Sequence, residues 1–262
     1  MDLGLKGKIA VVTGASRGIG KAIAKEFLKE GVSVFISGRN AADLENARIE
    51  LSEFGEIHAR QGDGTNADDV ESLASFAAEK NGFIDIWVNN VGVNKARKGE
   101  FYTESELDFL ISAVFKSAVY GTQSAVRHMR VGGSILNISS LAARSATCGR
   151  SNIYAAMKSA LLAYTRTCAG EYASRKIRVN AVLPGYTRTP LVERSFSKSD
   201  LERLMEGNLS RRMAEPEEIA KPAVFLSSEA ASYINGASLE ISGGQNIVLN
   251  PWQSFENCKS EN

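Results

Sequence analysis

Cysteine and histidine are scarce in this chain, and their scarcity argues against a disulfide framework and against a metal site. The 262 residues include three cysteines and two histidines. Cys148, Cys168 and Cys258 are odd in number and widely spaced, which excludes a disulfide framework and favours reduced thiols. His58 and His128 have no acidic or cysteine partners at ligand spacing, so we expect no metal site.

The chain also lacks a charge excess and a long apolar run. Lysine and arginine total 31 against 30 acidic residues, so the net charge of +1 does not favour nucleic acid or an anionic membrane. No apolar run approaches the roughly 18 residues of a membrane span, and the first residues lack the apolar core of a signal peptide. We therefore expect a cytoplasmic protein whose partner is a small molecule.

Short apolar, β-branched runs alternate with longer amphipathic stretches along almost the whole chain. This alternation predicts an α/β fold: a Rossmann-like, doubly wound, seven-stranded parallel sheet flanked by helices, in a single domain of residues 1–262. The expected strands are 9–13, 32–37, 57–61, 84–89, 134–139, 177–182 and 238–241. The expected helices are 18–29, 41–54, 67–80, 104–129, 151–173 and 217–226.

Two segments fall outside this alternation. Residues from about 186 to 214 are charged and weakly apolar, and they follow the carboxyl end of a strand, where ligands bind in open α/β sheets. We expect this segment to form a substrate lid. Residues from about 246 to 262 form a C-terminal tail with Trp252 and Phe255, and the sequence leaves open whether these aromatics pack on a neighbouring subunit or contact substrate.

The glycine-rich segment TGASRGIG, residues 13–20, follows the first expected strand and opens the first helix. Glycines let the backbone approach a pyrophosphate closely, and the unpaired N–H groups of the helix start face its negative charge. The strand before and the helix after are the context that a dinucleotide motif requires. The residues expected to hold a dinucleotide here are Gly14, Ser16, Arg17, Gly18, Ile19 and Gly20.

The end of the second strand indicates which dinucleotide is bound. An acidic residue there would bond a free ribose hydroxyl, but this chain has Gly38 and Arg39. Arg39 and Arg17 offer forked donors to a ribose phosphate, so we predict NADP(H). Asp63, after the third strand, either accepts a hydrogen bond from the adenine amino group or belongs to a helix N-cap segment.

Tyr154 and Lys158 lie one helical turn apart, so their side chains share a face. An ammonium about 4 Å from a phenol contributes about 4 kcal/mol at an effective dielectric near 20, roughly three pKa units. We therefore expect Tyr154 to titrate near neutrality and to act as an acid/base, although burial opposes this shift. Ser139 and Ser140 end the fifth expected strand, and Ser140 is our candidate to orient a substrate oxygen.

With these landmarks in order, the chain resembles the short-chain dehydrogenase/reductase family from about residue 6 to 244. Residues 13–20 resemble its TGxxxGxG motif, residues 89–92 its NNAG motif, and Ser140, Tyr154 and Lys158 its catalytic residues. The resemblance implies a homotetramer built through the fourth and fifth helices, and a cofactor whose adenosine half borders residues 89–92. Cofactor contacts that it implies are Asn90, Gly92, Tyr154, Lys158, Pro184, Gly185, Thr187 and Thr189.

Two residues depart from the family pattern. Val91 replaces the usual alanine of NNAG, which is a small steric change. Val114 stands where the family has a helix asparagine that helps to hold a proton-relay water. Because a valine side chain forms no hydrogen bond, either a backbone carbonyl alone positions that water or the relay is altered.

The activity expected from these residues is hydride transfer between NADP(H) and a ketone or secondary alcohol. By analogy within the family we expect a hydroxysteroid of the bile-acid type. The alternative substrate is a 3-oxoacyl thioester, for which Arg127 and Arg130 would form a basic patch against an acidic carrier protein. An alternative of another class is a catalytically silent NADP(H)-binding sensor or scaffold, which Val114 alone supports.

Overall fold

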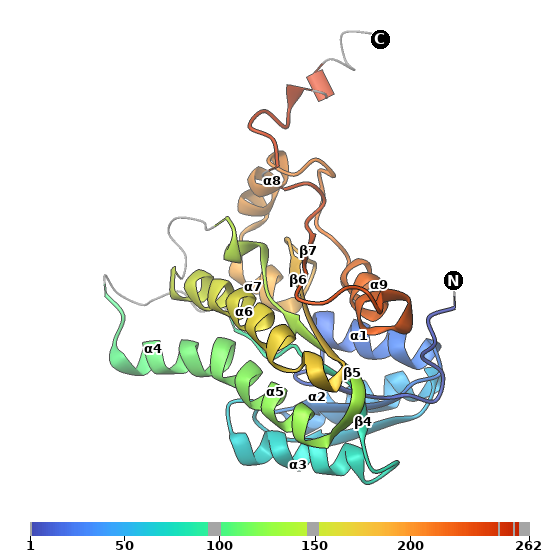
Figure 1. Cartoon of the computed structure of the whole chain (residues 1–262). Coiled ribbons are helices and arrows are strands. Elements are labelled where there is room, and N and C mark those ends of the chain that lie inside the picture. Colours follow the sequence, from blue (N-terminus) through green and yellow to red (C-terminus); the bar gives the residue numbers. More distant parts are fainter. Residues whose placement is uncertain (1, 94–100, 146–151, 246, 254, 257–262) are drawn as a thin grey trace.

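Seven parallel strands form one sheet in the computed structural model, which describes residues 2–93, 101–145, 152–245, 247–253 and 255–256. Their order is β3-β2-β1-β4-β5-β6-β7, so the predicted doubly wound sheet is confirmed (Figure 1). The strands are β1 (Ile9–Val12), β2 (Ser33–Gly38), β3 (Ile57–Gln61), β4 (Ile84–Asn89), β5 (Met129–Ile138), β6 (Ile177–Pro184) and β7 (Ser238–Ile241).

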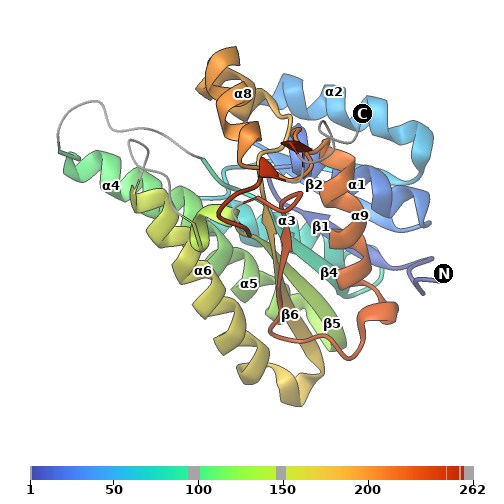
Figure 2. The same cartoon turned by 90° about the horizontal axis from the view of Figure 1, so that it is seen from above.

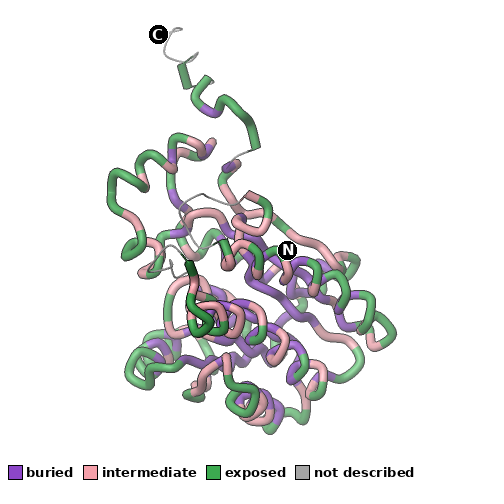
Figure 3. Tube along the Cα trace, turned by 90° about the vertical axis from the view of Figure 1, so that its left-hand side faces the viewer, coloured by how far each residue is buried: buried purple, intermediate pink, exposed green. Residues whose placement is uncertain are grey.

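Helices cover both faces of this sheet (Figures 1 and 2). They are α1 (Gly18–Lys29), α2 (Ala41–Leu51), α3 (Ala67–Ala78), α4 (Glu104–Ile111), α5 (Ser117–His128), α6 (Asn152–Glu171), α7 (Pro190–Ser195), α8 (Lys198–Glu206) and α9 (Pro216–Ser227). One apolar core joins the sheet to α1, α2 and α9, and a second joins it to α3, α5 and α6. Strands β1, β2 and β4 are therefore buried along their whole lengths. Figure 3 shows the buried segments of the chain, in purple, running through its interior.

The predicted helix 104–129 differs most from the structure. A π-helical turn, η2 (Ser112–Lys116), separates α4 from α5, and Ser117 Oγ donates to Ala113 O at 3.0 Å just beyond it. Strand β5 begins at Met129 rather than at residue 134 because Met129 pairs with Ile84 across a register irregularity. The sequence pattern hides this start, since Gly132 and Gly133 interrupt the apolar alternation.

The expected lid contains two short helices with recognisable start signals. Thr189 caps α7 by accepting a hydrogen bond from Val192 N, and Pro190 occupies the first helical position. Ser197 and Asp200 form a capping box at the start of α8. The Tyr186 and Phe196 rings meet edge to face with their centroids 5.3 Å apart, so α7 is fastened to the end of β6.

Residues 247–253 extend away from the body of the protein (Figures 1 and 3). Leu249, Trp252 and Phe255 are exposed, and the guanidinium of Arg211 lies over the Phe255 ring, 4.4 Å from its centre. Cys168 is a buried free thiol in α6, and Cys148 and Cys258 lie outside the described residues. Within the described ranges, no helix combines the length and the apolar character that a membrane crossing requires.

Candidate active site

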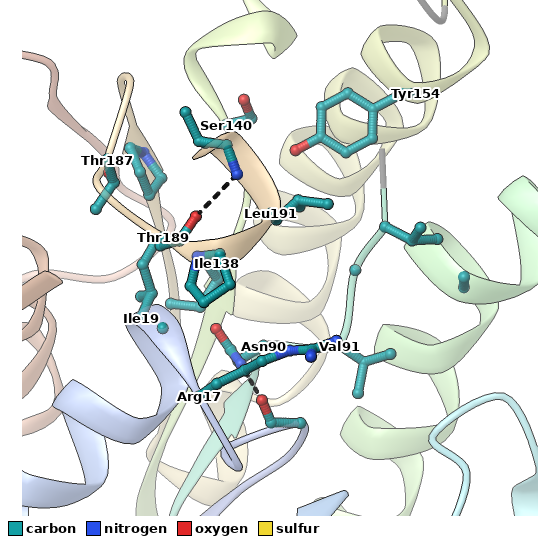
Figure 4. Close-up of a pocket in the computed structure, with 18 of the residues that line it drawn as sticks. Arg17, Ile19, Asn90, Val91, Ile138, Ser140, Tyr154, Thr187, Thr189 and Leu191 are labelled. Atoms are coloured by element: carbon teal, nitrogen blue, oxygen red, sulfur yellow. Dashed lines mark hydrogen bonds between the residues drawn. The ribbon is translucent and has the colours of Figure 1, made fainter. Parts of the chain in front are cut away.

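A cleft of about 610 Å³ opens at the carboxyl edge of the sheet, where the strand order reverses between β1 and β4. Figure 4 shows residues from the glycine loop, the ends of β4, β5 and β6, helix α6 and the lid converging on it. Almost every residue predicted to bind the cofactor or substrate lines this cleft. They are Gly14, Ser16, Arg17, Gly18, Ile19, Arg39, Asp63, Asn90, Gly92, Ser140, Tyr154, Lys158, Pro184, Gly185, Thr187 and Thr189.

Gly20 is the exception among these predicted residues. It is buried behind the loop, and a Cβ added to it would overlap the side-chain nitrogen of Asn90. Asn90 Nδ2 donates to Thr13 O at 3.1 Å and to Gly14 O at 2.9 Å. Gly20 therefore allows Asn90 to hold the loop, and Asn90 lines the cleft while its amide nitrogen supports the loop backbone (Figure 4).

The glycine loop has the backbone shape of a phosphate cradle. Gly14 and Gly18 have φ values of 62° and 59°, which side chains with a Cβ rarely adopt. Arg17 occupies the N-cap position of α1, and the first turn of that helix opens into the cleft. Unpaired N–H groups at a helix start attract an anion, so the loop and α1 fit a pyrophosphate.

Arg39 lies at the end of the cleft beyond β2, as the sequence predicted, and Gln61 Nε2 donates to its carbonyl at 3.0 Å. The sequence places no acid at the end of β2, but an acid does line the same cleft: Asp43, in the first turn of α2. It comes from the helix that starts after Asn40, the N-cap of α2, and not from the strand end.

Asp63 folds the loop after β3. Its Oδ1 accepts hydrogen bonds from the backbone nitrogen and the hydroxyl of Thr65, both at 2.9 Å. The N-cap of α3 is Asn66, whose side chain accepts from Asp68 N and Asp69 N. The helix N-cap that the sequence predicts in this segment is therefore Asn66. Asp63 supports the loop and lines the cleft, and its predicted hydrogen bond with the adenine amino group stays a prediction.

Lys158 is buried, with only 3% of its surface exposed. Its Nζ donates to Ile138 O at 2.6 Å, at the end of β5. Burial lowers the pKa of this ammonium to about 8, because a low-dielectric environment disfavours the charged form. The side chain nevertheless stays mostly protonated at neutral pH.

Tyr154 does not have the near-neutral pKa that its spacing from Lys158 predicts. Burial raises the pKa of the phenol, and a hydrogen bond with Ser140 opposes this increase only in part. Lys158 Nζ lies 5.8 Å from the centre of the Tyr154 ring and donates to a backbone carbonyl. Desolvation therefore outweighs the lysine charge in the protein alone, which corrects the estimate made from helical spacing.

The two serines at the end of β5 have different surroundings. Ser139 is buried, and its Oγ donates to Lys158 O at 3.0 Å, which ties α6 to the sheet. Ser140 is partly exposed in the cleft, and its Oγ accepts from Ala142 N at 3.2 Å. Ser140 and Tyr154 lie on the same side of the cleft in Figure 4. Of the two hydroxyls, that of Ser140 is available to a ligand.

A buried polar network beneath the cleft fixes the helices that carry it. Asn89 Nδ2 donates to Thr122 on α5 and to Asn137 on β5, at 3.1 and 2.9 Å. Asn137 Nδ2 in turn donates to Thr165 on α6 at 2.9 Å. Asn89 is only 4% exposed and, unlike Asn90 and Gly92, is not among the residues that line the cleft. It links α5 to α6 through Asn137, since Asn89 bonds to Thr122 on α5 and Asn137 bonds to Thr165 on α6.

Val114 and the two lid threonines complete the predicted set. Val114 is fully buried in the π-helical turn η2. Thr187 Oγ1 donates to Gly185 O at 3.1 Å, and Gly185 N donates to Ile241 O at 2.9 Å. These bonds fix the turn after β6, and Thr189, the cap of α7, also lines the cleft.

Several apolar side chains line the cleft, a feature that the sequence reasoning did not identify. They come from α4, from the segment after β5 and from the lid, which lie far apart in the sequence. These residues are Phe109, Leu141, Ala142, Tyr186, Leu191, Val192 and Phe196. Gln245, just beyond β7, lies among the lining residues and was also missed.

The predicted basic patch lies at the opposite edge of the sheet. Arg127 donates to Glu71 at 2.8 Å, and the Arg130 guanidinium stacks 3.9 Å from the centre of the Phe83 ring. Arg130 and Ser139 stand near opposite ends of β5, so the patch lies at the amino edge of the sheet and the cleft at its carboxyl edge. The patch is therefore remote from the cleft.

Both histidines have structural partners. His58 stacks on Phe35 with ring centres 4.6 Å apart, and His128 pairs with Glu71 at 2.7 Å. In the part of the chain that the structure describes, no three histidine, cysteine or acidic side chains come together as metal ligands.

Comparison with known proteins identifies the family. A sequence profile of the family described as enoyl-(acyl carrier protein) reductase matches residues 14–246. The structure of a short-chain dehydrogenase/reductase from Serratia marcescens superposes with a TM-score of 0.86, at 33% identity, over 92% of this chain and 98% of that one. The chain belongs to the short-chain dehydrogenase/reductase family. It is therefore an oxidoreductase of a family that uses nicotinamide cofactors.

Named relatives within the short-chain dehydrogenase/reductases act on different substrates. The 3-oxoacyl-(acyl-carrier-protein) reductase FabG of Chlamydia pneumoniae is 34% identical over 247 residues, which is 93% of this chain and 99% of that protein. The 3beta-hydroxysteroid dehydrogenase 2 of Eggerthella lenta is 36% identical over 250 residues, 92% of this chain and 95% of that protein. L-sorbose reductase from Gluconobacter frateurii, solved with NADPH and L-sorbose, has a TM-score of 0.87 at 31% identity, covering 95% and 100% of the two chains.

Proposed function

We propose that this protein is an NADP(H)-dependent oxidoreductase that interconverts a ketone and a secondary alcohol. The observation that carries the proposal is the convergence of Ser140, Tyr154 and Lys158 on the cleft that also contains the glycine loop. A pure dinucleotide-binding scaffold does not need all three of these side chains. The catalytically silent alternative is therefore less well supported.

The residues of the cleft fit a nicotinamide dinucleotide. Gly14 and Gly18, with their positive φ values, and the start of α1 fit its pyrophosphate. Lys158, Thr187 and Thr189 line the same cleft, and in this proposal Lys158 holds the nicotinamide ribose hydroxyls while Thr187 or Thr189 contacts the carboxamide. When bound, the nicotinamide supplies or accepts a hydride.

Tyr154 is the proposed proton donor and acceptor. In the direction of reduction its hydroxyl donates a proton to the carbonyl oxygen, and in oxidation it takes the proton back. Because burial raises the pKa of the phenol in the cofactor-free protein, Tyr154 carries the proton that it donates in reduction. The positive charge of an oxidised nicotinamide and that of Lys158 would both favour the phenolate needed for oxidation.

Ser140 orients and polarises the substrate oxygen in this scheme, since its hydroxyl lies in the cleft and bonds with that of Tyr154. The family's relay asparagine is replaced by the buried Val114. The π-helical turn η2 departs from the regular α-helical hydrogen-bond pattern. We therefore propose that backbone carbonyl groups of η2 position the relay water in place of the asparagine side chain.

The preference for NADP(H) rests on Arg17 and Arg39, whose guanidinium groups can bond a ribose phosphate. Asp43 opposes this preference, since a carboxylate repels that phosphate.

We expect Arg39→Ala to weaken NADPH binding by about tenfold to a hundredfold, the usual range for a hydrogen bond to a charged group, and to leave NADH binding nearly unchanged. Asp43→Asn should tighten NADPH binding. Calorimetric titration measures both effects, and equal changes for the two cofactors would contradict this assignment.

The substrate that we propose is a largely apolar ketone of the hydroxysteroid kind, with the steroid-active relative and the apolar side chains that line the cleft as support. A 3-oxoacyl thioester remains the second candidate because of the FabG relative. Arg127 and Arg130 do not help that candidate, since they are not among the residues that line the cleft and lie at the opposite edge of the sheet. We also propose that the protein is a homotetramer, as the family usually is.

Replacement of Tyr154 by phenylalanine tests the proposed chemistry. We expect Tyr154→Phe to lower kcat by about a hundredfold or more on a confirmed ketone, because general acid catalysis contributes that much, with little change in NADPH affinity. Steroid, acyl-thioester, sugar and small-ketone panels identify the ketone. Near-wild-type turnover by Tyr154→Phe would refute the mechanism. Tight NADPH binding without oxidation of NADPH across all four panels would instead favour the silent scaffold.

A further inference from the structure

Gln245 carries a buried polar atom that the mechanism does not use. The residue is 5% exposed and lines the same cleft as Ser140 and Tyr154. Its Oε1 has no hydrogen-bond partner among the residues that the structure describes, and no other buried side-chain nitrogen or oxygen there shares this state. A buried acceptor without a partner costs about 1–3 kcal/mol, so a conformation or complex that supplies a donor is favoured.

The backbone around Gln245 is held firmly, so its position is not the result of a loose loop. Asn208, at the end of the lid, donates through Nδ2 to Ser242 O at 2.9 Å. Ser210 donates to Gly243 O through both its backbone nitrogen and its hydroxyl, each at 3.1 Å. The lid therefore fixes the segment that carries Gln245 against the cleft.

The surroundings of Gln245 limit the kind of group that can satisfy it. The cleft that Gln245 lines also presents apolar side chains, such as Leu141, Leu191 and Phe196. A neutral amide oxygen in such a place accepts well from a hydroxyl or an N–H, whereas a cation would lose its hydration without an opposite charge. A neutral hydrogen-bond donor on a mostly apolar ligand is the chemistry that fits.

We infer that Gln245 is a substrate-recognition residue, which accepts a hydrogen bond from a hydroxyl that the substrate carries away from its reacting carbonyl. The substrate class is therefore an apolar ketone or secondary alcohol with a second, remote hydroxyl group. This inference rests on the proposed function and deepens it. Oε1 is buried in this conformation, and because the residue lines the cleft, the proposal requires a change of side-chain rotamer that presents Oε1 to the bound ligand.

The test compares matched ketones that differ in one group. One pair is cyclohexanone with a hydroxymethyl or an ethyl group opposite the carbonyl, and the other is a steroidal ketone with or without a hydroxyl on the far ring. We expect the wild-type protein to prefer the hydroxylated member of at least one pair by about tenfold to a hundredfold in kcat/KM, mostly through KM. In Gln245→Leu this ratio should fall to near one.

Two further variants make the result specific. Gln245→Glu keeps an acceptor and should retain a preference for the hydroxylated ketone, which also covers the case in which Gln245→Leu folds poorly. Gln253→Leu removes an exposed amide from the same C-terminal segment and should leave the ratio unchanged. Equal ratios in the wild type and both Gln245 variants would overturn the inference.

A loss of NADPH affinity with an unchanged ratio would also overturn it, because the amide would then serve the cofactor. Failure of the wild type to reduce any ketone with NADPH or NADH would refute the proposed function and this inference together. Turnover of both ketones without discrimination by the wild type would refute the inference alone. The two failures are therefore distinguishable.

Discussion

The buried ammonium of Lys158 should make the free energy of unfolding rise with pH above about pH 8, and Lys158→Met should remove this dependence. Burial lowers the pKa of Lys158 from 10.5 to about 8. An unfolded lysine keeps its ordinary pKa, so folding releases a proton between these two values. Below about pH 8 the buried ammonium destabilises the folded protein in full. This destabilisation disappears as the pH rises towards about 10.5, because the folded protein then holds a neutral amine.

The size of this effect follows from the shift. Two and a half pKa units at about 1.4 kcal/mol each give about 3 kcal/mol of destabilisation at neutral pH. Lys158→Met removes that cost but leaves Ile138 O without its donor, which costs about 1–3 kcal/mol. The two terms largely offset each other at neutral pH, so the variant should be as stable as the wild type or somewhat more stable.

The pH dependence separates the two terms, because the lost hydrogen bond does not titrate. Between about pH 7 and pH 10 the wild type should gain about 2–3 kcal/mol relative to Lys158→Met. Urea unfolding of the cofactor-free proteins at several pH values measures the difference, and groups that both proteins share cancel. Lys198→Met, which removes a lysine whose side chain is 92% exposed, is the control that should show no such trend. A constant difference between wild type and Lys158→Met would refute the reasoning.

Two other substitutions test the packing and the electrostatics. Gly121→Ala should destabilise the protein by about 1–3 kcal/mol in thermal unfolding, because the added Cβ would overlap Asn89 Oδ1 in the buried network. Gly170→Ala, on α6 with no atom within 4 Å of the added Cβ, should instead stabilise it by about 0.5–1 kcal/mol, and the opposite order would contradict the packing. Hydrogen bonds from Arg212 lower the pKa of Glu218 to about 2, so its contribution to stability is present above about pH 4.5 and is lost as the pH falls through about 2. Arg212→Ala should return this pKa towards 4.5 in an NMR titration, and an unchanged value would exclude the ion pair as its cause.

Periodicity located the elements that depend on local pattern. All seven strands lie where β-branched runs predict them, and Pro216 starts α9 as an N-terminal proline should. The π-helical turn η2 escaped prediction, since its residues have the same apolar spacing as an α-helix. The early start of β5 escaped because it depends on pairing with Ile84 of another strand.

The site was predictable as a set of residues but not as an arrangement. The motifs named Ser140, Tyr154 and Lys158, yet they could not show that Ser139 binds Lys158 O or that Asn89 faces the core. The pKa of Tyr154 was misjudged for the same reason. Helical spacing sets which side chains share a face, whereas burial depends on everything packed around them.

The burial of Lys158 also bears on whether the protein is a catalyst or a scaffold. No carboxylate contributes to its pKa among the described residues, and its Nζ donates to the backbone carbonyl of Ile138. A lysine in this position weakens the fold at neutral pH, and an apolar side chain of similar length would not. Stability alone therefore does not explain an ammonium at this position. The proposed catalysis does explain it, because a positive charge there would hold the ribose hydroxyls and favour a phenolate at Tyr154. We therefore favour catalysis over silent binding.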